Sequence, residues 1–202
     1  MRFRLTAIPI ILLALSCGAV IYQPRDGDIL FQTLNTPRSR SLANVTRSSY
    51  NNVGIVYFHK GRPLVLDVGD RVRVTPLEQW ITLGMENRFV VRRLRAADQI
   101  LTAAVIQRIF RRVKKTIGMP ADDAFSWDDQ AYYASELIWK VISKGAGVEL
   151  VPLQTLDDFD LAELPNHHPI WQRFETRSPR EEPAVSPQAI FESSLLETVY
   201  EQ

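Results

Sequence analysis

The sequence predicts one domain that combines a β-sheet with helices. Its 202 residues, of which 46% are hydrophobic and 23% charged, are enough to bury a core. Short apolar runs separated by glycine-containing turns lie between residues 53 and 75, a pattern typical of strands. Residues 96–117 instead repeat their apolar side chains about once per helical turn. Together these patterns predict a mixed fold of strands and helices.

The composition excludes two classes of function. The formal net charge is +1, so the chain has no general attraction for polyanions, and we expect no nucleic-acid partner. Its single cysteine, Cys17, lies in the N-terminal segment. The body, residues 23–202, therefore has neither a disulfide nor a thiol for nucleophilic catalysis.

Residues 1–22 have the pattern of an export segment. Arg2 and Arg4 precede an apolar stretch, residues 5–15, and small residues follow at positions 16–19. Three outcomes stay open: cleavage as a signal peptide, lipid attachment at Cys17, and retention as an anchor, because residues 5–22 carry no charge. In each case we expect an exported protein, either periplasmic or anchored to the membrane.

The predicted strands follow one another through most of the first half of the body. They cover residues 29–32, 53–59, 63–68, 71–75 and 88–94. The three residues Lys60-Gly61-Arg62 predict a tight hairpin turn. Residues 35–52 are polar and are interpreted as a long surface loop with one helical turn, while residues 76–83 predict a helical turn that carries Trp80.

Two longer helices follow. The first covers residues 96–117 and ends at Gly118, and its polar face is basic. That face is interpreted as solvated, with contact to anionic lipid as the alternative. Its basic residues are Arg108, Arg111, Arg112, Lys114 and Lys115.

The second helix is expected to begin near Trp127, with Ser126 as its N-cap and Asp129 three residues later. Residues 148–152 predict a short final strand. The tail is expected to pack around the sheet, with a capped stretch at Ser186-Pro187.

Several blocks, in this order along the chain, resemble one family. They are residues 27–32 (GDILFQ), 52–56 (NVGIV), 65–67 (VLD), 75–77 with Trp80, 127–129 (WDD), 132–139 (YYASELIW), 158–161 (DFDL) and 185–187 with Ile190, Phe191 and Ser193. The ordered set is similar to the circularly permuted papain-like hydrolases of the NlpC/P60 superfamily, the YiiX-like group.

This resemblance implies a fold, an activity and a catalytic arrangement. The fold is α+β, with an antiparallel sheet packed against helices. Members cut amide bonds, typically in bacterial cell-wall peptides, and some relatives act on lipid acyl groups. A histidine comes first on a strand, an acidic or polar partner follows on the next strand, and a cysteine opens a later helix. There the helix dipole stabilises the thiolate, and the histidine accepts its proton. Neither a cofactor nor a metal is implied.

Two of the three catalytic positions lack the chemistry that the family needs. The histidine falls at Asn52, the acidic partner at Asp67 and the cysteine at Ala134. Asparagine has no titrating nitrogen and alanine has no nucleophile. The resemblance thus implies a binding cleft at Asn52, Asp67, Tyr133, Ala134 and Ser135 without catalytic groups. Asp67 is then either a retained polar strand residue or a hydrogen-bond acceptor for Asn52.

Three functions stay open. The first is a non-catalytic member that binds a cell-wall peptide, an acyl ligand or a partner protein. The second is an active hydrolase with relocated chemistry, at Ser135 with His59 or at a metal held by His167 and His168. The third is an adaptor at the membrane surface, through residues 1–22 and the basic helix face. Asn52 and Ala134 are also consistent with an engineered loss of catalytic residues.

Overall fold

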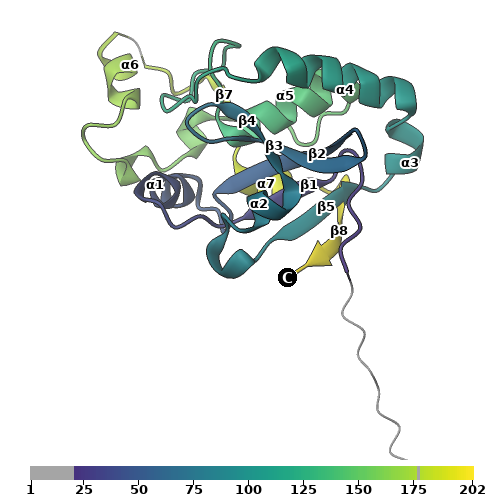
Figure 1. Cartoon of the computed structure of the whole chain (residues 1–202). Helices are drawn as coiled ribbons and strands as arrows, with labels where there is room; N and C mark the ends of the chain where they lie inside the picture. Colours follow the sequence, from purple (N-terminus) through teal and green to yellow (C-terminus); the bar gives the residue numbers. More distant parts are fainter. Residues whose placement is uncertain (1–20, 177) are drawn as a thin grey trace, which may run out of the picture.

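A six-stranded antiparallel sheet lies at the centre of the molecule (Figure 1). The computed structural model describes residues 21–176 and 178–202, and its strands follow the order β4-β3-β2-β1-β5-β8. The strands are β1 Ile29–Gln32, β2 Asn52–His59, β3 Arg62–Val68, β4 Val72–Pro76, β5 Val90–Leu94 and β8 Leu196–Glu201. The predicted α+β class, with its antiparallel sheet, is confirmed.

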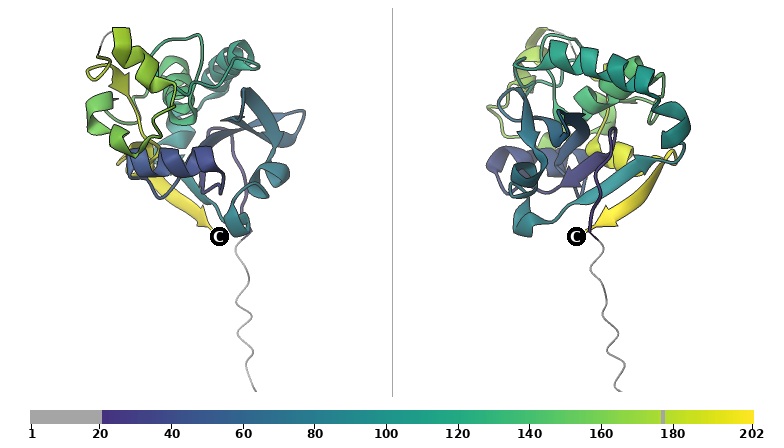
Figure 2. Two further views of the ribbon diagram at one scale, coloured as in Figure 1. Left: turned by 90° about the vertical axis from the view of Figure 1, so that its left-hand side faces the viewer. Right: turned by 45° about the vertical axis from the view of Figure 1, so that its right-hand side comes forward.

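Helices cover both faces of this sheet (Figures 1 and 2). Helix α4 (Ala103–Thr116) packs on α5 (Ala134–Ala146), and α5 packs in turn on β2 and β3. On the opposite face, α2 (Leu77–Ile81) lies against β3 and β4. The sheet is therefore the middle layer, with α5 as its main cover.

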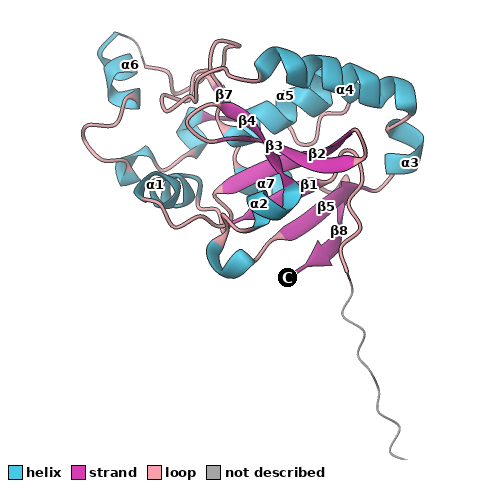
Figure 3. Ribbon diagram, viewed as in Figure 1, coloured by secondary structure: helices cyan, strands magenta, loops and turns pink. Residues whose placement is uncertain are grey.

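The remaining elements are short and lie around this centre (Figure 3). They are the helices α3 Ala97–Ile100, α6 Ile170–Thr176 and α7 Pro187–Phe191, three single 3₁₀ turns (Met85–Asn87, Leu156–Asp158 and Leu161–Glu163), and a separate pair of two-residue strands, β6 Gln154–Thr155 and β7 Pro183–Ala184. Ser186 caps α7 by accepting a hydrogen bond from the Ala189 N–H at 3.1 Å, as its sequence predicts.

The hairpin between β2 and β3 forms at the predicted turn. His59 pairs with Arg62, which leaves Lys60 and Gly61 as a two-residue loop. Both have positive φ, 51° and 76°, as a type I′ turn requires. This turn fixes the register of β2 on β3.

The interpretation of residues 35–52 as a surface loop is wrong. Helix α1 (Pro37–Thr46) occupies most of this segment. The Thr36 side chain accepts from the Ser39 N–H at 3.1 Å, and the Ser39 hydroxyl accepts from the Thr36 N–H at 3.0 Å. This reciprocal cap, with proline at the first helical position, starts a helix that has little apolar periodicity to reveal it.

The single helix expected over residues 96–117 is two helices. Helix α3 ends at Ile100, and α4 begins after Thr102, whose side chain accepts from the Val105 N–H at 3.4 Å. Leu101, expected in the apolar stripe, lies at the break. Because the stripe remains periodic on both sides of the break, the apolar pattern does not reveal the threonine cap inside it.

The expected start of the second helix is also wrong. Helix α5 begins at Ala134, seven residues after Trp127, and Tyr133 is its N-cap. Asp122 instead holds the preceding loop by accepting from the backbone N–H groups of Ala124 and Ser126, at 2.7 and 2.5 Å. Residues 148–152 form no strand, and the last strand is β8.

The N-terminal predictions fall mostly outside the described residues. Cys17 and the rest of residues 1–20 are among those that the structure does not describe. Across residues 21–176 and 178–202, no helix is both long and apolar enough to span a bilayer.

A smaller core lies beneath α2, on the sheet face opposite α5. Trp80 is fully buried there with Leu30, Val56 and Val65. A Cβ at Gly54 would lie 2.4 Å from Val65 Cγ1 and 3.5 Å from Trp80 Nε1. Glycine at position 54 therefore allows the indole to pack closely on the sheet.

Gly54→Ala should lower the free energy of unfolding, because the added methyl group overlaps Val65 and forces the small core to shift. Overpacking of this kind costs about 1–3 kcal/mol. Urea denaturation measures the loss. The control Gln79→Ala changes an exposed side chain of α2 and should leave the free energy of unfolding almost unchanged. An equal loss for both variants would contradict this explanation.

Candidate functional site

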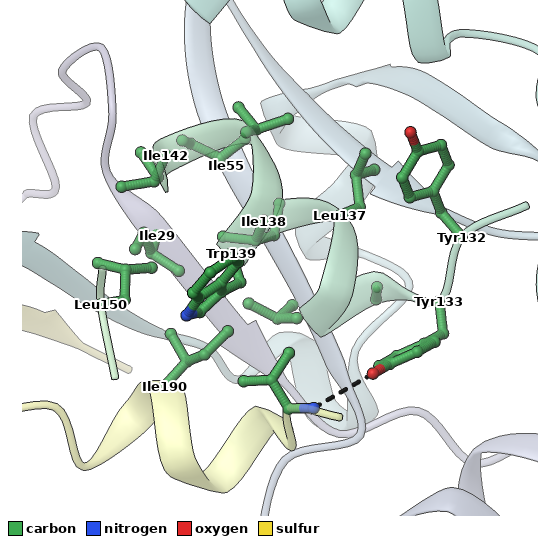
Figure 4. Close-up of a cluster of buried hydrophobic side chains, with 14 of the residues drawn as sticks. Ile29, Ile55, Tyr132, Tyr133, Leu137, Ile138, Trp139, Ile142, Leu150 and Ile190 are labelled. Carbon is green, nitrogen blue, oxygen red and sulfur yellow. Dashed lines mark hydrogen bonds between the residues drawn. The ribbon is translucent and has the colours of Figure 1, made fainter. Parts of the chain in front are cut away.

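The first turn of α5 carries three of the five predicted cleft residues. Tyr133, Ala134 and Ser135 are 5%, 9% and 2% exposed. The Tyr133 hydroxyl accepts from the Val185 N–H at 3.2 Å (Figure 4). The Ser135 hydroxyl donates to the Val185 carbonyl at 2.7 Å. Two hydrogen bonds to one residue thus hold the beginning of the helix against the C-terminal segment.

A buried ion pair joins the first and second turns of α5. Glu136 and Lys140 are 0% and 6% exposed, and Lys140 Nζ lies 2.7 Å from Glu136 Oε1. Lys140 Nζ also donates to the Asp128 carbonyl at 2.7 Å and to Asp129 Oδ1 at 3.1 Å. Burial raises the pKa of Glu136 to about 8, although the nearby ammonium opposes the shift.

Asp129 belongs to this network and not to a helix cap. Its Oδ2 accepts from Lys144 Nζ at 2.9 Å. Hydrogen bonds from Lys144, and then from Lys140, lower the pKa of Asp129 to about 2. The ammonium of Lys140 lies 4.6 Å from the ring centroid of Trp127. The Trp-Asp-Asp block therefore surrounds a lysine, which explains its spacing from α5.

Asn52 lies at the start of β2, directly opposite Gln32 at the end of β1. The two residues are 2% and 1% exposed. Among the described residues, neither Asn52 Nδ2 nor either amide atom of Gln32 has a hydrogen-bond partner. Unpaired buried amides are uncommon in proteins, so this pair of side chains requires an explanation.

Asp67 is fully buried, and its carboxylate is occupied. Arg73 donates to both oxygens, from Nε at 2.9 Å and from Nη2 at 3.0 Å, and Trp80 Nε1 donates to Oδ2 at 3.1 Å. These contacts contradict the expectation that Asp67 accepts from Asn52. Asp67 remains the polar strand residue of the other interpretation.

The structure brings the predicted cleft residues together in three groups. Tyr133, Ala134 and Ser135 open α5, Asn52 meets Gln32, and Asp67 meets Arg73 and Trp80. By strand alternation, Asn52 shares a sheet face with Gly54 and Val56, whereas Val53 and Ile55 point into the core beneath α5. This alternation turns the Asn52 side chain away from α5, whereas Ala134 packs in the core beneath α5. That the two residues face one another across a cleft stays a prediction.

A known protein family matches nearly all of the described chain. Residues 23–200 match the family described as "Permuted papain-like amidase enzyme, YaeF/YiiX, C92 family". The chain belongs to this family. The resemblance that the ordered motifs gave is thereby confirmed.

Individual relatives agree with this assignment. The C92 chain is 34% identical over 190 residues to the protein YiiX of Escherichia coli (strain K12), covering 94% of this chain and 93% of YiiX. It is also similar to a solved structure described as metalloprotein yiiX from Escherichia coli O157:H7. The TM-score is 0.76 and the identity 34%, over 90% of this chain and 99% of the other.

The residues considered for relocated catalysis are poorly placed for nucleophilic chemistry in this C92 chain. Ser135 donates its proton to a carbonyl, and no base contacts it among the described residues. His59 is exposed at the far end of β2 from Asn52. His168 Nδ1 accepts from the Ile170 N–H at 3.4 Å, and burial lowers the pKa of this imidazole. None of the three forms a nucleophile–base pair.

The basic face of α4 borders a small hollow beside α5. Cationic, acidic and apolar side chains line its volume of about 200 Å³, and they include Arg112, Lys115, Met119, Asp129, Leu137, Lys140, Val141 and Lys144. The predicted basic residues at positions 112 and 115 thus lie beside the Lys140 network. Arg108, by contrast, donates to the Gly145 carbonyl at 3.1 Å and joins the two helices.

Three residues of this region were missed in the sequence. Gln32 lies in the Gly-Asp-Ile-Leu-Phe-Gln block, but nothing there indicates that its amide is unpaired. Arg73 and Trp80 were not expected to hold Asp67. The spacing of Asp67 and Arg73 on either side of the Gly69-Asp70 turn was the available signal, because strands joined by a tight turn pair directly.

Glu136→Gln should change how stability depends on pH. The folded pKa of about 8 lies above the ordinary glutamate pKa of 4.5, so the folded state binds this proton more tightly. The contribution of Glu136 to stability therefore falls as pH rises from 4.5 to 8. The stability of the unmodified protein relative to Glu136→Gln should fall by a few kcal/mol, in order of magnitude, between pH 5 and pH 8.

Urea denaturation at several pH values measures this difference. The variant Glu78→Gln, in the exposed part of α2, controls for the loss of a carboxylate elsewhere. The opposite result, an unmodified protein that becomes more stable relative to Glu136→Gln as pH rises, would contradict the prediction. It would mean that Lys140 stabilises the Glu136 anion more than burial penalises it.

Proposed function

We propose that this protein is a non-catalytic member of the C92 family that binds an amide-containing ligand, a cell-wall peptide or an acyl amide, without cleaving it. The observation that carries the proposal is the pair Asn52 and Ala134 at the positions of the family's histidine and cysteine. Neither side chain can accept a proton from a nucleophile or attack a carbonyl.

The state of Asp67 supports this proposal. In the family arrangement this position orients the imidazole. Here Arg73 and Trp80 occupy its two oxygens with three hydrogen bonds of 2.9–3.1 Å. A carboxylate held in this way stabilises the sheet and does not need a histidine beside it.

The surroundings of Ser135 count against the alternative, an active hydrolase with relocated chemistry. A serine nucleophile needs a base that accepts its proton. The Ser135 hydroxyl is buried and donates to the Val185 carbonyl. Its hydrogen bond fixes the start of α5, which is a structural role.

A metal-dependent reaction is not supported by the residues present. The similar structure from Escherichia coli O157:H7 carries the description metalloprotein. Across residues 21–176 and 178–202, no group of three or more His, Cys, Asp or Glu side chains lies close enough to hold a metal ion. His167 and His168 therefore lack the further ligands that a zinc site needs.

The N-terminal segment supports a proposal for the cellular location of the protein. We propose that residues 1–22 export the chain and leave the domain of residues 23–202 in the periplasm or tethered to the membrane through Cys17. A cell-wall peptide or a lipid-derived amide is available to a protein in that location.

The double variant Asn52→His and Ala134→Cys should gain amide hydrolysis if the two positions lie close together, because it restores a base at the start of β2 and a thiol at the start of α5. The substrates are the cell-wall tripeptide L-Ala-γ-D-Glu-diaminopimelate and N-octanoyl-alaninamide, followed by mass spectrometry. The unmodified protein should bind at least one of them, measured by calorimetry, and leave it intact.

The matched controls are the two single variants, which restore only one group each. Turnover by the unmodified protein that disappears in Ser135→Ala or His59→Ala would overturn the proposal in favour of relocated chemistry. Absence of binding to either substrate would overturn the proposed ligand class.

A cross-linking experiment tests whether positions 52 and 134 lie close together. In a chain without Cys17, the pair Asn52→Cys and Ala134→Cys should react with a short bifunctional thiol reagent to give an intramolecular cross-link. The control pair, His59→Cys and Ala134→Cys, places one thiol at the far end of β2 and should not. Equal cross-linking in both pairs would contradict the predicted arrangement.

A further inference from the structure

We propose that Gln32 is a ligand-contacting residue of this site, and that the amides of Gln32 and Asn52 together recognise the –CO–NH– group of the ligand. This inference rests on the proposed function and specifies it. It adds Gln32 on β1 to the strand residues of the site, Asn52 on β2 and Asp67 on β3, and it predicts that the site prefers amides to esters.

The first argument is the state of the Gln32 side chain. It is 1% exposed, and neither Oε1 nor Nε2 has a partner among the described residues. A buried amide without hydrogen bonds costs about 1–3 kcal/mol. Asn51, the residue before Asn52, is a buried amide with its hydrogen bonds satisfied. Its Oδ1 accepts from the Leu34 N–H at 2.7 Å, and its Nδ2 donates to the Leu34 carbonyl at 3.1 Å.

The second argument is the position of the unpaired atoms. Gln32 and Asn52 are directly paired across β1 and β2, so their side chains lie on the same face of the sheet. The unpaired atoms are two N–H₂ donors and one carbonyl acceptor. A secondary amide offers the matching set, because its oxygen accepts and its N–H donates.

The third argument is that polar side chains continue from this pair to the surface. Asp67 lies on β3 beside Gly54, two residues along β2 from Asn52, and Arg73 pairs with Asp67 on β4. The Arg73 side chain is 44% exposed. We call Gln32, Asn52, Asp67 and Arg73 the polar track. It runs across four strands on one sheet face, from the buried Gln32 to the partly exposed Arg73.

An ester distinguishes this arrangement from simple apolar binding. Replacing the N–H of the ligand by oxygen removes the donor to Gln32 Oε1 and leaves that atom unpaired in the complex. A site built to hydrogen-bond an N–H rejects an analogue that lacks it. The Gln32 carbonyl thereby provides the selectivity, whereas the two N–H₂ groups hold the ligand carbonyl.

The test compares Gln32→Met with the unmodified protein. Methionine keeps the length of the side chain and removes its polar atoms. The probes are L-Ala-γ-D-Glu-diaminopimelate and N-octanoyl-alaninamide, each paired with the analogue in which an ester replaces the acyl amide. Calorimetry should show about tenfold weaker binding of the amide probe to Gln32→Met and no remaining preference over the ester.

Unfolding in urea gives a second readout. Gln32→Met should raise the midpoint, because it removes two unpaired polar atoms, whereas Asn51→Leu should lower it by removing satisfied ones. Gln107→Met, in the exposed part of α4, should leave both binding and the midpoint unchanged.

Each outcome decides one of the two proposals. Binding of an amide probe that Gln32→Met leaves unchanged would overturn the role of Gln32 and leave the proposed function standing. A midpoint that falls in Gln32→Met would also overturn it, because the amide would then have internal partners. Absence of binding to every probe by the unmodified protein would overturn the proposed function itself.

Discussion

The burial of helix α5 is the constraint on which the rest of the structure depends. Residues from Ala134 to Ile142 are all buried, between α4 on one side and the sheet on the other. Every polar side chain in this stretch must therefore find its partner inside the protein. Ser135 does so at Val185, and Glu136 and Lys140 pair with each other and with the loop before the helix.

These pairings do not involve the side chains of Asn52 and Ala134. Neither Asn52 nor Ala134 takes part in the networks around Lys140 and Asp67, which hold α5 and the β3–β4 pair in place. The contacts that hold the fold therefore do not depend on which residues stand at positions 52 and 134. The retained family motifs then reflect packing as much as chemistry, which is consistent with a binding protein built on an amidase fold.

The sequence predicted the central strands well because their signals are local. The Lys60-Gly61 turn and the apolar runs beside it determine β2 and β3. Among the elements that were not predicted, helix α1 has a capping residue but little apolar periodicity, and β8 forms a strand because it pairs with β5, which is distant in the sequence. The site positions came from motifs, whereas the unpaired state of Gln32 depends on β1 and β2 meeting and was not predictable.

The position of β8 has a consequence for how the chain acquires its structure. Leu196 pairs with Leu94, so the outer edge of β5 stays open until the last residues of the domain arrive. Closing a loop of about one hundred residues is entropically slow, and contacts of such long range lower the folding rate. In a nascent chain the outer edge of β5 therefore stays unpaired until residues 196–201 have been synthesised, and an unpaired strand is exposed to any protein that recognises unfolded polypeptides.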